Sequence, residues 1–159
     1  MVSPLILKGG PYVVTQGFGC TTYSEEIPDP SCPTGYFHSG IDIGCPCGTL
    51  ALAGGVGVVS RIGSTAVKGI CQGKCKQGCL GPNAVGITSD LGLTFWYGHL
   101  QSHAVRAGQK VVRGQPLGLT GTMGCSTGCH LHFEVDPGID ARPLTLDSLD
   151  PSLYLDGWG

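Results

Sequence analysis

Short runs of β-branched, aromatic and alternating residues recur along the whole chain, and turn-forming residues separate them. These runs predict β-strands at residues 12–15, 56–62, 84–88, 93–97, 111–112 and 131–135. Segments such as Ala53-Gly54-Gly55 and Leu80-Gly81-Pro82-Asn83 indicate turns between strands. No window carries the 3.6-residue periodicity of an amphipathic helix three turns long. The pattern therefore predicts an all-β domain with short connections.

Length and charge restrict the class of protein further. A chain of 159 residues fits a single domain, expected to span 1–159, with a real hydrophobic core. The net charge of −2 is unlike the concentrated basic surface of nucleic-acid binders, so no nucleic-acid partner is expected. No run is long and apolar enough to cross a membrane, so no membrane insertion is expected. The first apolar run is broken by Lys8-Gly9-Gly10, and we expect no secretory signal peptide.

Two segments are long for structureless connections. Residues 20–35 contain three prolines among polar residues, and residues 63–82 contain Cys71, Cys75 and Cys79 among glycines and lysines. Long loops of this kind are often functional or cross-linked. We expect both loops to belong to the same domain as the strands.

Four of the five histidines fall in three short contexts, and two of them alternate. His130 and His132 are two residues apart in an expected strand, so both project to one face while Leu131 points to the core. Two imidazoles on one face can converge on a small site. They can equally be two histidines on an exposed strand face, and the alternation alone does not separate these readings.

The stretch His38-Ser39-Gly40-Ile41-Asp42 joins a histidine to a carboxylate. On a straight strand these two side chains would be about 13 Å apart, too far to share one ion. Gly40 permits a bend that brings them together. We expect His38 just before a strand and Asp42 on it. An exposed histidine followed by a turn aspartate remains the alternative.

Together these pieces favour metal chemistry. Two histidines and a carboxylate form a catalytic zinc site that leaves one tetrahedral position for water. Zinc lowers the pKa of such a water molecule to about 7. Two further histidines could then exchange protons and stabilise a developing oxyanion.

Four stretches of the chain resemble the lysostaphin-type peptidoglycan endopeptidases, which are peptidase family M23 or LytM-like domains. In order they are HSGIDIGCPCGTLALAGGVGVV, FWYGHL, VRAGQKVVRGQPLG and TGTMGCSTGCHLHFEV, covering roughly residues 37–135. The closing stretch around Asp150-Pro151 extends the likeness to about residue 155. The resemblance implies a twisted, mostly antiparallel sheet of the duplicated hybrid-motif type, with a zinc site in a groove on one face.

The resemblance also implies a role for each histidine except one. It implies that the Zn²⁺ ligands are His38, Asp42 and His132, and that the catalytic residues are His99 and His130. The choice of His132 over His130 as ligand rests on the family and not on spacing. His103 matches no functional position, and we expect it to be an ordinary surface residue.

The implied activity is hydrolysis of peptide bonds in bacterial peptidoglycan by a zinc metalloendopeptidase. The expected partner is the peptidoglycan peptide, the expected place of action is extracytoplasmic, and the expected state is a monomer. Without a signal peptide, a phage lysin or a virion-associated enzyme is a reasonable source.

Two competing functions are weighed against this one. A non-catalytic relative would bind or regulate a cell-wall enzyme, but such relatives typically lack ligands, whereas here all five positions are filled. The stretch VRAGQKVVRGQPLG also resembles a hairpin of biotinyl and lipoyl carrier domains, whose fold is duplicated in glucose-type IIA phosphocarriers. Those phosphocarriers need no set like His38, Asp42 and His132.

Several residues near the expected site have open roles. Glu134 shares a strand face with the two histidines if the alternation holds, and it is either a partner of a ligand or solvent-facing, which we favour. The loops 20–35 and 63–82 are expected to wall the groove. Four aromatic residues are candidates for its lining, although such residues are more often part of a core: Tyr36, Phe37, Trp96 and Tyr97.

Nine cysteines set this chain apart from the family pattern, which usually has none around the site. Their number favours an oxidising environment and leaves at least one unpaired if the others pair within the chain. Sharing of zinc would bring the strands of Asp42 and His132 together, so we expect a disulfide from Cys45 or Cys47 to Cys125 or Cys129. Cys20–Cys32 would close the first loop. Cys71, Cys75 and Cys79 are expected to pair among the cysteines of the second loop or, alternatively, to bind a second metal.

Overall fold

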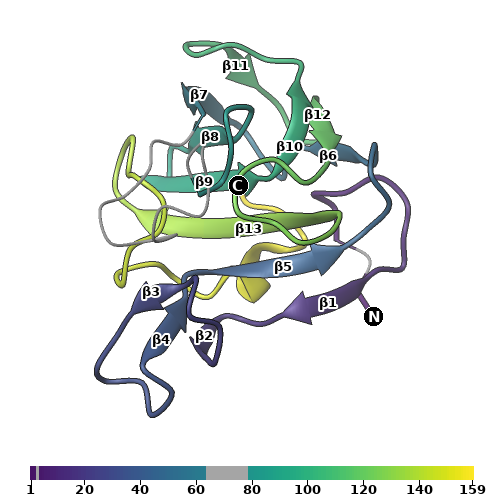
Figure 1. Ribbon diagram of the computed structural model, residues 1–159. Helices are drawn as coiled ribbons and strands as arrows, with labels where there is room; N and C mark the ends of the chain where they lie inside the picture. The colour runs from purple at the N-terminus through teal and green to yellow at the C-terminus, as the bar shows by residue number, and fades with distance from the viewer. Residues whose placement is uncertain (3, 64–78) are drawn as a thin grey trace.

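The computed structural model describes residues 1–2, 4–63 and 79–159, and the regular secondary structure in them is almost wholly β (Figure 1). The strands, followed by one short 3-10 helix, are β1 (Val13–Gln16), β2 (Gly19–Thr21), β3 (Ile27–Pro28), β4 (Tyr36–His38), β5 (Gly40–Gly44), β6 (Leu50–Leu52), β7 (Gly57–Ile62), β8 (Val85–Thr88), β9 (Leu93–Gly98), β10 (Leu100–His103), β11 (Lys110–Val111), β12 (Pro116–Thr120), β13 (His130–Pro137) and η2 (Pro151–Tyr154). The all-β prediction is confirmed. None of the described helices is long and apolar enough to cross a membrane.

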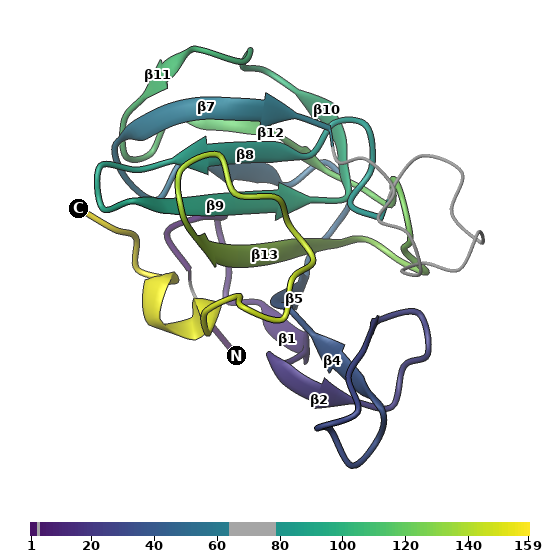
Figure 2. The same cartoon turned by 90° about the vertical axis from the view of Figure 1, so that its left-hand side faces the viewer.

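One large sheet organises the molecule. Its seven strands run in the order β1-β5-β13-β9-β8-β7-β11, and every pairing within it is antiparallel (Figure 2). The six strands predicted from the sequence all occur, as β1, β7, β8, β9, β11 and β13, with ends displaced by no more than two residues. The antiparallel sheet expected from the sequence is therefore present.

Two smaller sheets complete the fold. One has the order β10-β12-β6 and lies behind the large sheet, and the other has the order β2-β4-β3 and projects from one end of it (Figures 1 and 2). The sequence did not predict these strands. Most are two to four residues long, and runs this short seldom carry an alternation that can be recognised.

The two faces of the large sheet have different chemistry because strand side chains alternate. On β13, Leu131, Phe133 and Val135 point into the main core, and Ile41 and Ile43 of β5 join them. This core lies between the large sheet and the β10-β12-β6 sheet. The residues that alternate with these core residues along β13 and β5 therefore point to the opposite face of the large sheet. That face carries the polar side chains described below.

The C-terminal residues pack onto the main core. Trp158 is buried, and its ring stacks on Phe95 with centroids 3.7 Å apart. Tyr154 contacts the same phenylalanine edge-on. The last turn of the chain therefore closes the core beneath the large sheet.

A second, smaller cluster covers part of the opposite face. The segment 138–149, which follows β13, crosses in front of β8, β9 and β13 (Figure 2). Within it Leu144 packs with Trp96, whose indole N–H donates to the carbonyl of Ala141 at 3.0 Å. We call residues 138–149 the covering segment.

Candidate metal centre and active site

Strand register brings a histidine and a carboxylate face to face. β5 and β13 are paired so that Asp42 lies opposite His132, and His38 ends β4 just before β5 begins. A break at Ser39 turns the chain between the two strands. The structure therefore places Asp42 on a strand, as expected, and His38 at the end of a short strand of its own.

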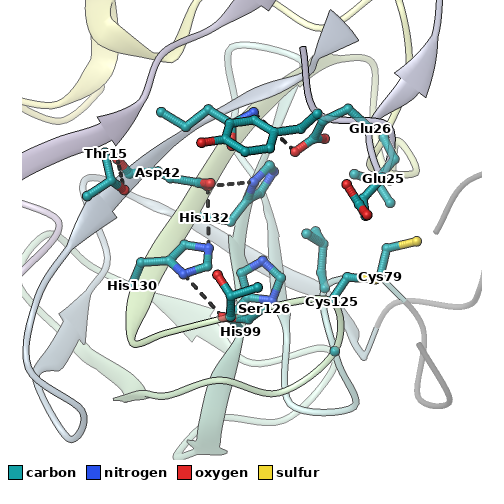
Figure 3. Close-up of a pocket in the computed structure, with 16 residues that line it drawn as sticks. Thr15, Glu25, Glu26, Asp42, Cys79, His99, Cys125, Ser126, His130 and His132 are labelled. Atoms are coloured by element: carbon teal, nitrogen blue, oxygen red, sulfur yellow. Dashed lines mark hydrogen bonds and ion pairs between the residues drawn. The ribbon is translucent and has the colours of Figure 1, made fainter. Parts of the chain in front are cut away.

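Three candidate ligand atoms converge at this point. His38 Nε2 is 3.4 Å from Asp42 Oδ1, His132 Nδ1 is 3.1 Å from Asp42 Oδ1, and the two ring nitrogens are 3.2 Å apart. All three side chains are buried. Figure 3 shows Asp42 and His132 directed toward one another, with His130 and His99 below them in the view.

The far nitrogen of each candidate ligand is already occupied. His38 Nδ1 donates to the carbonyl of Gly17 at 2.8 Å, and His132 Nε2 donates to Glu134 Oε2 at 2.9 Å. In a neutral imidazole these hydrogen bonds leave the lone pair on the inward nitrogen. Each ring is thus held in the tautomer that a metal ligand requires.

The spacing of the three atoms fits a metal ion. In a tetrahedral site with bonds of about 2.0–2.1 Å, ligand atoms lie about 3.3 Å from one another. The observed separations of 3.1, 3.2 and 3.4 Å agree with this edge length. Two neutral imidazole lone pairs and a carboxylate oxygen would repel one another without a positive charge among them. The trio can therefore hold a cation and leave a fourth position open.

Without an ion, the cluster keeps a proton in that place. Burial alone would raise the pKa of the Asp42 carboxyl, but hydrogen bonds from His132 and His38 outweigh it and hold the pKa well below its ordinary value. Burial alone would lower the pKa of His132, but hydrogen bonds to Asp42 and Glu134 raise it to about 10. An incoming cation displaces the proton between His132 and Asp42, so metal binding releases protons here.

Two further imidazoles border the same point. His99 lies between β9 and β10, and its Nδ1 donates to the carbonyl of Met123 at 2.7 Å. His130 begins β13, and its Nδ1 donates to the carbonyl of Gly128 at 2.8 Å. The two ring centroids are 4.5 Å apart, and His130 Nε2 is 3.6 Å from Asp42 Oδ1.

His99 is held in an unusual state. Its backbone has a φ of 64°, a left-handed conformation that costs a non-glycine residue on the order of 1 kcal/mol and is typical of functional sites. Burial, together with the nearby His130 and His132, lowers the pKa of His99 to about 3. The ring is therefore neutral at physiological pH, with its Nε2 lone pair available to accept a proton.

A cleft of about 480 Å³ opens onto these groups. Tyr23, Glu25 and Glu26 from the loop 20–35 line one side, as expected of that loop. Residues 124–127 line the other side, together with Cys79 and Leu80, and Figure 3 shows Cys79 beside Cys125. The remainder of the expected second wall, 64–78, lies outside the described residues.

The four aromatic candidates do not line this cleft among the residues that the structure describes. Trp96 and Tyr97 are fully buried on opposite faces of β9, and the Tyr97 hydroxyl accepts from the Gly54 N–H inside the core. Tyr36 and Phe37 lie half-buried on β4. These side chains therefore pack within the sheets, because large aromatic rings at strand centres bury more surface area than any polar neighbour.

Two expectations about single residues need correction. Glu134 was favoured as solvent-facing, but it is fully buried: its Oε2 accepts from His132, and its Oε1 accepts from Leu144 of the covering segment. Gly40 assists the site by absence of a side chain, not by an unusual backbone angle. A Cβ there would lie 2.5 Å from His132 Cε1.

His103 is exposed and contacts Asn83, as expected of a surface residue.

Disulfides brace both sides of the cleft. Cys20–Cys32 closes the first loop, as predicted, and Cys47–Cys129 joins the segment after β5 to the residue before His130, one of the predicted alternatives. Cys45 is a buried free thiol. Cys79 and Cys125 are each disulfide-bonded, so Cys79 is no thiolate ligand for a second metal. Cys71 and Cys75 lie outside the described residues.

Several groups that orient the histidines were missed. They are the carbonyls of Gly17, Met123 and Gly128, together with the Ser126 hydroxyl 3.2 Å from His130 Nδ1. Backbone carbonyls leave no trace in the residue types of a sequence. Only the tertiary fold reveals them.

Comparison with known proteins agrees with this geometry. Residues 36–144 match peptidase family M23. The chain is 36% identical over 98 residues to the peptidoglycan DD-endopeptidase ShyA of Vibrio cholerae. The aligned region covers 62% of this chain and 20% of that protein. The chain thus spans about a fifth of the length of this relative.

Solved structures share the fold. The catalytic domain of the antimicrobial peptidase lysostaphin from Staphylococcus simulans superposes with a TM-score of 0.68 at 24% identity, over 92% of this chain and 93% of that domain. A zinc-containing peptidase from Vibrio cholerae superposes with a TM-score of 0.65 at 26% identity, over 92% of this chain and 38% of that one. By its match over most of its length, its fold and its relatives, this chain belongs to peptidase family M23.

Proposed function

We propose that this protein is a zinc-dependent endopeptidase that hydrolyses peptide bonds in bacterial peptidoglycan, outside the cytoplasm. His38, Asp42 and His132 would hold Zn²⁺, and His99 and His130 would be the catalytic residues. The observation that carries the proposal is the convergence of three ligand atoms, 3.1–3.4 Å apart, beside two more imidazoles in one cleft.

The choice of zinc follows from the donor set. Two imidazole nitrogens and one carboxylate oxygen with an open fourth position are typical of catalytic zinc sites. The relative described as a zinc-containing peptidase supports the same ion. Bound zinc supplies Lewis acidity toward a carbonyl oxygen and lowers the pKa of a water molecule to about 7.

The chain's own residues then handle the protons. His99 and His130 each have one nitrogen fixed by a backbone carbonyl and the other available. One ring accepts a proton from the attacking water, and a proton is later delivered to the departing amine. A protonated ring in this position also stabilises the negative charge that develops on the carbonyl oxygen.

The substrate class is supported by the relatives and by the open cleft. The V. cholerae relative acts on peptidoglycan by its name, and a cleft bordered by loops on two sides suits an extended peptide. Action as a monomer and delivery by a phage stay predictions.

Digestion of purified sacculi from several bacteria tests the proposal. With zinc present, we expect peptide-cleaved fragments, identified by mass spectrometry, and no fragments after chelation until zinc is restored. The His103→Ala variant changes an exposed histidine outside the cleft, so it should cleave sacculi like the wild type. Failure to cleave any wall despite one tightly bound zinc would instead favour a domain that binds or regulates a wall enzyme.

A further inference from the structure

Two carboxylates lie side by side behind the candidate metal ligands. His132, Glu134 and Asp136 are every second residue of β13, so their side chains lie on one face of the sheet. On one neighbouring strand, β5, Asp42 pairs with His132 and Gly40 pairs with Glu134, and the other neighbouring strand is β9. Glu134 is 0% exposed and Asp136 is 1% exposed. The covering segment 138–149, which crosses in front of β13 (Figure 2), contacts both: Leu144 donates to Glu134 and Thr145 donates to Asp136. Two ionised carboxylates in such a place would be costly.

Each carboxylate oxygen of Glu134 accepts a hydrogen bond from an N–H group. Its Oε2 accepts from His132 Nε2 at 2.9 Å, and its Oε1 accepts from the Leu144 N–H at 2.6 Å. Leu144 has a φ of 65°, so a non-glycine residue adopts the left-handed conformation where this N–H meets the carboxylate. Two N–H donors therefore hold the Glu134 side chain in place beside His132.

Asp136 lacks such partners. Its Oδ1 accepts from the Thr145 hydroxyl at 3.1 Å, but its Oδ2 is buried and has no donor. The charged groups that act on it include Glu134 and, more weakly, His132, both on β13. From β9 it faces Thr94, whose hydroxyl donates elsewhere, to the Gly138 carbonyl. Burial and the adjacent Glu134 raise the pKa of Asp136 to about 9.

We propose that Asp136 is a neutral carboxylic acid whose Oδ2 hydroxyl donates to Glu134, and that it thereby acts as a positioning residue for His132. The proton satisfies the one buried oxygen without a donor and removes the repulsion between the two carboxylates. Glu134 then accepts from three sides and cannot rotate away from His132. The chain Asp136–Glu134–His132 fixes the ring with Nδ1 toward the metal position.

The protonation of Asp136 does not depend on the proposed function, whereas its effect on metal binding rests on it. The two parts are therefore measured separately. Infrared spectroscopy of the metal-free and the zinc-loaded protein at neutral pH should show the carbonyl band of a protonated carboxylic acid in both. Asp136→Asn should remove this band, and Asp147→Asn, at an exposed acid of the covering segment, should not.

In the wild type the band should disappear as the pH rises through about 9. A spectrum without such a band at neutral pH, or one that Asp136→Asn leaves unchanged, would overturn the shared proton. These outcomes need no zinc binding and no activity.

Competition with a chelator then measures zinc affinity. Asp136→Ala should weaken zinc binding about tenfold, the low end for loss of an outer partner of a ligand. Asp136→Asn should bind zinc close to wild type, because its amide N–H replaces the carboxylic acid proton. Equal losses in the folded Ala and Asn variants would contradict a positioning role. Absence of zinc binding in the wild type, with the infrared band intact, would overturn the metal assignment alone.

Discussion

The two halves of the cleft are built in different ways. The proposed metal half, His38, Asp42 and His132, is held by paired strands and by buried partners on the sheet face. The proposed proton-exchange half, His99 and His130, is oriented by carbonyls of the loop segment 121–129. One half thus depends on the rigid sheet and the other on a loop that disulfides hold in place.

This difference suggests a division of labour. A metal site needs fixed distances, which strand register provides, since each residue of β13 from His130 to Glu134 has one partner on β5. Proton exchange needs imidazoles with one free nitrogen, which a carbonyl on the other nitrogen provides. Damage to the sheet half should therefore remove metal and activity together, whereas damage to the loop half should remove activity alone.

The largest effect is expected from Asp42→Ala. It removes the only carboxylate among the three candidate ligands, so zinc affinity should fall by more than about 100-fold, beyond the loss of an outer partner. Zinc content after gel filtration and sacculus digestion measure both consequences. Asp147→Ala serves as the matched control. Full zinc content in Asp42→Ala would place the metal elsewhere.

His99→Ala should reduce turnover by about 10²–10⁴-fold, the usual contribution of a general acid or base. Zinc should remain at one equivalent, because His99 is fixed to Met123 and not to the ligand trio. Rates on a soluble peptide substrate and zinc content, taken on the same preparation, separate the two. If this variant loses its metal, the residue has been assigned to the wrong half.

Loss of the Cys47–Cys129 disulfide should have a smaller effect. Cys129 directly precedes His130, and the carbonyl that orients His130 lies one residue before it, at Gly128. A Cys47→Ser, Cys129→Ser variant should lose up to about 100-fold in turnover, as expected for a small misplacement of a catalytic group. Zinc content should be kept.

The Cys20→Ser, Cys32→Ser variant is the comparison for this experiment, because that disulfide closes the other wall of the cleft. We expect a change in KM larger than the change in kcat there, since this loop lines the cleft but orients neither catalytic imidazole. Identical kinetic losses in the two variants would argue against separate roles for the two walls.

The loop half should also make stability depend on pH. The pKa of His99 is lowered to about 3 in the folded protein, against about 6.5 in an unfolded chain. Between these values the unfolded chain binds a proton that the folded chain does not, so the free energy of unfolding falls by about 1 kcal/mol per pH unit as the pH falls. The free energies of unfolding of metal-free wild type and metal-free His99→Gln, measured with urea, should therefore approach each other as the pH falls. If the difference between the two free energies stays constant with pH, His99 titrates normally.

The sheet half was more predictable from the sequence than the loop half. The alternation around His130, Leu131 and His132 identified the strand and its polar face, since side-chain direction in a strand follows from spacing alone. The break after His38 was expected from Gly40, although the glycine is needed for the ring of His132 and not for its backbone angle. Such close contacts depend on a strand that is distant in the sequence.

The supporting groups could not be predicted in this way. Burial of Glu134 depends on the covering segment, whose path over β13 is set by Leu144 packing on Trp96. The Met123 and Gly128 carbonyls depend on loop conformation, which residue types do not encode at this detail. Pairing of Cys47, and not Cys45, with Cys129 likewise follows from side-chain direction after β5 has ended.

X-ray absorption at the zinc edge, on protein loaded with one equivalent of zinc, tests the central claim most directly. The arrangement of His38, Asp42 and His132 predicts only nitrogen and oxygen neighbours, with the scattering signature of two imidazoles. Asp42→Ala should abolish that signal at the same zinc concentration. Sulfur neighbours, or an unchanged spectrum in Asp42→Ala, would contradict the account and place the ion outside the cleft.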